Sequence, residues 1–96
     1  MRIAVVGAGA MGSLFGGLLA EAVYGEDPRL LEALLNSALP AGYGYNCTVY
    51  DAAWRRLLSV EARGYDPLRA EAAVYVMFGY RGSPGVRYVV LSVSGG

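Results

Sequence analysis

The chain has 96 residues, of which 55% are hydrophobic and 17% are charged, and its eight basic residues balance eight acidic ones. This length allows one small domain, residues 1–96, and zero net charge argues against a nucleic-acid or acidic-membrane partner. The chain contains no His and no Lys. We therefore expect no His-based metal site, and the commonest general acid–base residue is absent. A single cysteine, Cys47, excludes an internal disulfide and fits a reducing compartment, which predicts a cytoplasmic protein.

The first 22 residues carry the most specific pattern in the chain. A short apolar run at residues 3–6 leads into the sequence GAGAMG, and an apolar helical pattern follows over residues 10–22. Strand, glycine-rich turn and helix in this order bind the pyrophosphate of a dinucleotide, because the free N–H groups and the helix dipole face the phosphates. The pattern therefore predicts a cofactor-binding turn made of Gly7, Ala8, Gly9, Ala10, Met11 and Gly12.

The same stretch allows other interpretations. Met1-Arg2, an uncharged run over residues 3–20 and the sequence AEA at residues 20–22 are typical of a secretory signal peptide, and the run approaches the length of a membrane span. The glycines inside the run weaken a signal helix, so we expect no membrane partner. Small residues that only pack a helix on a sheet are the remaining alternative.

The rest of the chain alternates helical and extended patterns. Asp27 and Pro28 suit the start of a helix, which Pro40 and Gly42 end. Further along, the patterns predict a strand at 45–50, a helix at 52–63 closed by Gly64, a helical turn at Asp66-Pro67, a strand at 74–78, a loop at 79–85 and a strand at 86–93. This alternation predicts an α/β fold with a small doubly wound parallel sheet of about four strands, one half of a Rossmann-like domain.

An acidic residue about 20 positions past the glycine turn is expected to bind the adenosine ribose. Asp51 lies 39 positions past Gly12, and 20 once residues 23–41 are set aside, which indicates an inserted helix there. Asp51 either contacts the ribose or caps a helix that begins at the next residue. Its charge favours NAD over NADP, whereas Arg55 or Arg56 could accept the 2′-phosphate of NADP.

The stretch GAGAMGSLFGGLLAEA resembles the N-terminus of the ketopantoate reductases (2-dehydropantoate 2-reductases), members of the 6-phosphogluconate-dehydrogenase-like Rossmann superfamily. The resemblance is close over residues 1–22 and returns loosely at 46–64 and 86–94. It implies an oxidoreductase that reduces a small 2-oxo acid, usually with NADPH. It also implies cofactor contacts at Ser92 and Ser94. Family members place a lysine near the Ser94 position, and because a serine cannot supply that charge, we identify no catalytic residue.

The family's C-terminal helical domain, which carries the remaining catalytic groups, has no counterpart here. The resemblance therefore implies the cofactor domain of a truncated or split reductase, inactive alone, whose partners would be the dinucleotide and a missing helical domain or a second copy. A non-catalytic nucleotide-binding module and a small secreted or membrane-anchored protein are the alternatives. Cys47 lies inside an expected strand, where we expect a buried apolar residue rather than a nucleophile.

Overall fold

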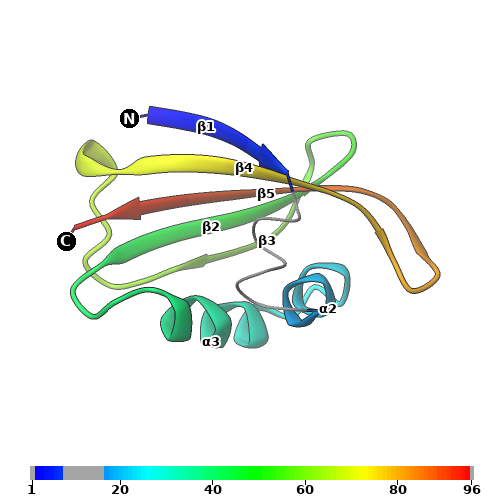
Figure 1. The fold of residues 1–96 in the computed structure, drawn as a ribbon, viewed down its shortest axis with the longest axis horizontal. Coiled ribbons are helices and arrows are strands. Elements are labelled where there is room, and N and C mark those ends of the chain that lie inside the picture. The colour runs from blue at the N-terminus through cyan, green and yellow to red at the C-terminus, as the bar shows by residue number, and fades with distance from the viewer. Residues whose placement is uncertain (1, 8–16, 96) are drawn as a thin grey trace.

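The computed structural model describes residues 2–7 and 17–95. For residues 2–7 only the backbone is described. Figure 1 shows a sheet with two helices packed on the same side of it. In chain order the elements are β1 (Arg2–Gly7), α2 (Leu18–Tyr24), α3 (Pro28–Ala38), β2 (Gly44–Asp51), β3 (Arg56–Glu61), a 3-10 turn (Pro67–Arg69), β4 (Glu71–Tyr80) and β5 (Ser83–Ser94).

The strands form one mixed sheet in the order β1-β4-β5-β2-β3. Strand β1 pairs with β4 in parallel, and each of the other neighbouring pairs is antiparallel. The expected doubly wound parallel sheet is therefore wrong. The physical reason lies in the connections: β2 and β3 are joined by residues 52–55, and β4 and β5 by Arg81 and Gly82. Such short links can only join antiparallel neighbours, because parallel neighbours need a crossover of a dozen or more residues.

The helix expected at residues 52–63 is also wrong, because this stretch forms the turn after β2 and then β3. The register shifts between Val49 and Tyr50, so that Leu58 pairs with Val49 while Arg56 pairs with Tyr50. This β-bulge leaves Leu57 as an extra residue, and both Leu57 and Leu58 contribute to the hydrophobic core. Two adjacent core residues break the alternation of a strand and imitate the spacing of an amphipathic helix.

Other expectations are confirmed with adjusted bounds. Helix α3 begins as predicted: Pro28 is its first residue, and the N–H of Leu30 donates to the side chain of Asp27 at 3.1 Å. The strand at 45–50 and the turn after Asp66 are present. The loop expected at 79–85 is wrong: β4 runs to Tyr80 and β5 begins at Ser83, because Arg81 and Gly82 both have positive φ, the geometry of a tight hairpin turn. Of the helix expected at 10–22, the described part begins at Leu18.

One face of the sheet carries the core. Along β2, Tyr45, Cys47 and Val49 are at most 2% exposed, and they face the two helices, because alternate residues of a strand share a face. Leu31 and Leu35 of α3 are fully buried against them. Among the helices of the described ranges, none has the length and hydropathy needed to cross a membrane.

We expect Leu35→Ala to lower the free energy of unfolding by about 2–5 kcal/mol, because it removes buried methyl groups and leaves a cavity between α3 and the sheet. The control is Ser37→Ala on the same helix, at an exposed position, for which we expect a change within about 0.5 kcal/mol. Urea unfolding monitored by circular dichroism measures both. Equal effects of the two substitutions would show that α3 does not pack on the sheet as described.

Candidate functional site

The glycine turn begins at the end of β1. Gly7 is the last residue of that strand and pairs with Val76 of β4. The other five residues of the expected turn, Ala8, Gly9, Ala10, Met11 and Gly12, lie outside the described residues. The described chain resumes at Gly17, and α2 follows on the helical side of the sheet. Strand β1 and helix α2 therefore lie before and after the glycine-rich segment in the chain.

Asp51 lies at the same edge of the sheet as Gly7, but not beside it. Gly7 pairs with Val76, Val76 with Tyr88, and Tyr88 with Tyr50, so these four residues form one row across four strands. Asp51 follows Tyr50. Since neighbouring strands lie about 4.8 Å apart, the backbones of β1 and β2 are separated by about 14 Å. In a Rossmann-like half the acidic residue ends the strand next to the first, a placement that this strand order does not give.

The Asp51 carboxylate organises the turn between β2 and β3. Its Oδ1 accepts hydrogen bonds from the N–H groups of Ala53 at 2.9 Å and Arg55 at 3.0 Å, and its Oδ2 accepts one from Nε of Arg55 at 2.9 Å. The Arg55 N–H is the main cause that holds the pKa of the Asp51 carboxyl below its ordinary value; the Ala53 N–H and the Arg55 guanidinium add to it, and burial opposes it. The carboxylate therefore strengthens the turn above its ordinary pKa, and this contribution disappears as the pH falls through the lowered value.

Ser92 and Ser94 lie far from the glycine turn. Strand β5 runs opposite to β1, so its end lies at the other edge of the sheet. Ser92 is four residues along β5 from Tyr88, about 14 Å away. Both serines are buried: Oγ of Ser92 bonds the Tyr65 hydroxyl at 2.7 Å, and Oγ of Ser94 accepts from the Asp66 N–H at 3.0 Å. They anchor the segment between β3 and β4, and the structure does not bring them together with Gly7.

A cluster of aromatic side chains, which the sequence did not predict, lies on the face of the sheet opposite the two helices. Trp54, in the turn after β2, stacks on Tyr88 with ring centroids 4.0 Å apart and an interplanar angle of 4°. The centroid of its ring is 5.6 Å from that of Tyr50, and these two rings are tilted. Tyr50 and Tyr88 are register partners and therefore share a face. The sequence assigned Trp54 to a helix, which hid this arrangement; recognition of a hairpin between residues 45 and 61 would have revealed it.

A second aromatic group joins α2 to the β4–β5 hairpin. Tyr24 stacks on Tyr80 with centroids 6.2 Å apart, and the guanidinium of Arg87 lies 5.1 Å from the centre of the Tyr24 ring. The Tyr24 hydroxyl donates to the Gly85 carbonyl at 2.7 Å. Burial raises the pKa of Tyr24, and the charge of Arg87 acts against that shift. These contacts hold α2 against the β4–β5 hairpin, so we assign the group a structural role.

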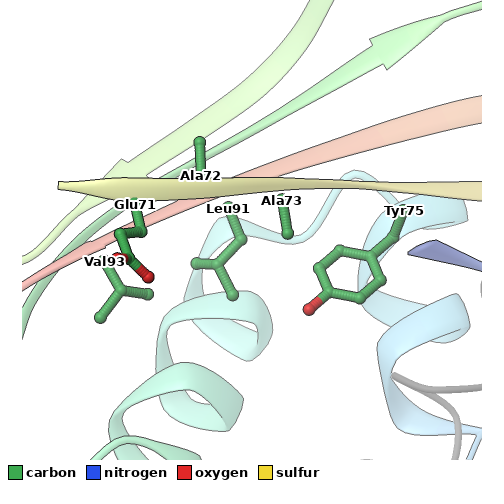
Figure 2. Close-up of a pocket in the computed structure, with 6 residues that line it drawn as sticks. All are labelled: Glu71, Ala72, Ala73, Tyr75, Leu91 and Val93. Carbon is green, nitrogen blue, oxygen red and sulfur yellow. The ribbon is translucent and has the colours of Figure 1, made fainter. Parts of the chain in front are cut away.

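A small pocket of about 290 Å³ lies on the helical face of the sheet, beside the first half of β4 (Figure 2). Side chains of Ala73, Tyr75, Leu91 and Val93 line it, with the Glu71 carboxylate at one end. Ala72 points to the opposite face. Its lining is largely apolar and offers no nucleophile paired with a base. It also lies at the start of β4, away from the end of β1, because Glu71 pairs with Arg2 and Val76 with Gly7.

Cys47 is fully buried, as expected from the sequence, and burial raises the pKa of its thiol to about 12. No cluster of His, Cys, Asp and Glu that could hold a metal ion occurs within residues 17–95. Comparison of the chain with models of protein families, with curated proteins and with solved structures found no match.

We expect the Cys47 thiol to resist alkylation at pH 8 in the native protein and to react rapidly in denaturant, because only the thiolate is nucleophilic. The raised pKa also predicts that stability falls as the pH rises above about 9, since the unfolded chain releases the thiol proton first. Timed reaction with a chromogenic disulfide and urea unfolding at several pH values measure these effects, with Cys47→Ala as the control for the pH series. Equal reaction rates in the two states would contradict the burial of Cys47.

Proposed function

We propose that the chain is a nucleotide-binding module that holds the phosphates of an NAD(P)-type dinucleotide with the glycine segment 7–12. The observation that carries the proposal is the position of Gly7: the strand β1 ends on the first glycine of GAGAMG. Backbone N–H groups that leave a strand through glycines can approach phosphate oxygens closely, because no side chain stands in the way. The resemblance of residues 1–22 to ketopantoate reductases supplies the cofactor class.

The arrangement of the strands supports this edge as the binding edge. Strands β1, β4 and β2 run in the same direction, since β4 and β2 are both antiparallel to β5. Their carboxyl ends therefore lie at one edge, which is where ligands bind in sheets that contain parallel strands. Arg87 pairs with Met77, the residue after the partner of Gly7, and so adds a cation near this edge. The proposal does not require a doubly wound sheet.

The proposed activity is binding, without a complete reductase site. Asp51 is held within its turn, and the two serines that the resemblance associates with the cofactor lie at the opposite edge. Whether Asp51 also selects NAD over NADP stays a prediction, which the ratio of the two affinities in wild type and Asp51→Ala would test.

We expect Gly9→Val to weaken binding of both NADH and NADPH at least tenfold, because a branched side chain would stand where the pyrophosphate approaches. The matched control is Gly17→Val, at an exposed position where an added Cβ meets nothing within 4 Å. Isothermal titration calorimetry measures the affinities, and circular dichroism verifies folding. If wild type binds neither dinucleotide, or if a folded Gly9→Val protein binds as tightly as wild type, the proposal fails.

We expect the isolated chain to reduce ketopantoate far more slowly than about 1 per second, the low end of ordinary enzyme turnover. The chain contains no His and no Lys to protonate the developing alkoxide. The assay follows NADH or NADPH absorbance at saturating substrate, with a known ketopantoate reductase as positive control. Turnover in the ordinary range would show that a reaction centre exists in this chain.

A further inference from the structure

The exposed face of Trp54 is a surface that the phosphate site does not use. We propose that Trp54, backed by Tyr88, stacks on the base of a nucleotide, and that Arg56 pairs with a phosphate of the same molecule. The inference rests on the proposed function for the class of ligand, and it names where the base of that ligand lies. It differs from the sequence-based expectation, which placed the nucleoside at Asp51.

The stacking geometry leaves one face of the indole free. Trp54 lies parallel to the Tyr88 ring at 4.0 Å, so one face of the indole covers the tyrosine. Trp54 nevertheless remains 55% exposed, which places its other face toward solvent. An exposed aromatic face binds a base by stacking, whichever base it is, because every base has a flat π-surface.

The turn presents Trp54 rigidly. Its φ of 59° lies in the left-handed region, which is uncommon for a bulky residue. Two backbone hydrogen bonds close the turn, from Trp54 N–H to the Asp51 carbonyl and from Asp51 N–H to the Arg55 carbonyl, both at 3.0 Å. The Asp51 carboxylate adds three more. Because the ring is already fixed, little conformational entropy remains to be lost when a ligand stacks on it.

The bulge in the β2–β3 hairpin places a positively charged side chain, Arg56, on the face of the aromatic cluster. Arg56 pairs with Tyr50 in the register, so its side chain projects from the same face as Tyr50 and Tyr88. Arg56 is exposed, whereas its neighbour Arg55 is paired with Asp51 at 2.9 Å. Glu61, at the far end of β3, accepts a hydrogen bond from the Asn46 amide at 3.1 Å. An exposed ring and a cation that project from the same face of the sheet match a base that carries a phosphate.

The site fits a free nucleotide better than a nucleic-acid strand. Proteins bind a nucleic-acid strand with several cationic side chains along its phosphate backbone, whereas this chain has zero net charge. The backbones of Gly7 and Tyr88 lie in one row two strands apart, which is about 10 Å.

The experiment compares AMP, adenosine and ribose 5-phosphate, titrated into the full chain. Trp54 is the single tryptophan, so its fluorescence reports stacking directly. We expect AMP and adenosine to quench it and ribose 5-phosphate to leave it unchanged. By calorimetry, Trp54→Ala should weaken AMP binding about tenfold, while the control Tyr43→Ala, at an exposed tyrosine elsewhere, should not.

The charge is tested separately with Arg56→Glu, which should weaken AMP binding and leave adenosine binding unchanged, against the matched control Arg63→Glu at another exposed arginine. This pair keeps the proposal falsifiable if Trp54→Ala does not fold. The inference is overturned if AMP does not quench Trp54, if Arg56→Glu binds AMP like wild type, if a short RNA binds far more tightly than AMP, or if the surface instead pairs two copies of the chain. Loss of NADH binding in Gly9→Val with unchanged binding in Trp54→Ala would overturn this inference alone. Loss in Trp54→Ala with none in Gly9→Val would overturn the phosphate site alone.

Discussion

The structure depends on the burial of one face of the sheet. Along β2, Tyr45, Cys47 and Val49 are at most 2% exposed, whereas on the other face Asn46 and Tyr50 are partly exposed and Thr48 is a buried polar residue. Hydrophobic burial is the dominant favourable term in folding, so both helices must cover the same face. A doubly wound domain buries both faces of its sheet. The second face of β2 carries Asn46, Thr48 and Tyr50 in place of aliphatic side chains, which does not suit a second layer of helices and leaves this face available for other contacts.

Local signals in the sequence predict part of this fold correctly. The Asp27 cap followed by Pro28 specifies the start of α3, because capping depends on residues within one turn. The β-branched and aromatic run at residues 45–50 specifies β2 in the same way. Strand pairing is different, because it depends on residues far apart in sequence. The glycine pattern near the N-terminus favours a parallel sheet, whereas the short links after Asp51 and Tyr80 make β3 antiparallel to β2 and β5 antiparallel to β4.

The candidate site is predictable only where the chemistry is local. The end of β1 at Gly7 follows from adjacent residues, and the burial of Cys47 follows from its place within an apolar strand. The arrangement of Trp54 over Tyr88 joins residues from two strands, and the bulge that turns Arg56 to their side has no signature of its own. Sequence spacing predicts Asp51 near a ligand, but its carboxylate accepts three hydrogen bonds from Ala53 and Arg55, within the next four residues.

The bulge between β2 and β3 has a further consequence for how the molecule behaves in a crowded solution. Strand β3 is at the edge of the sheet, and a flat edge strand exposes backbone groups that can pair with another molecule and begin aggregation. The extra residue at Leu57 bends this edge, and the charged side chains of Arg56 and Glu61 stand at its two ends. An incoming strand would meet an irregular ladder bounded by charge. The β-bulge that imitates a helical pattern in the sequence thus also makes β3 a poor template for pairing with another molecule.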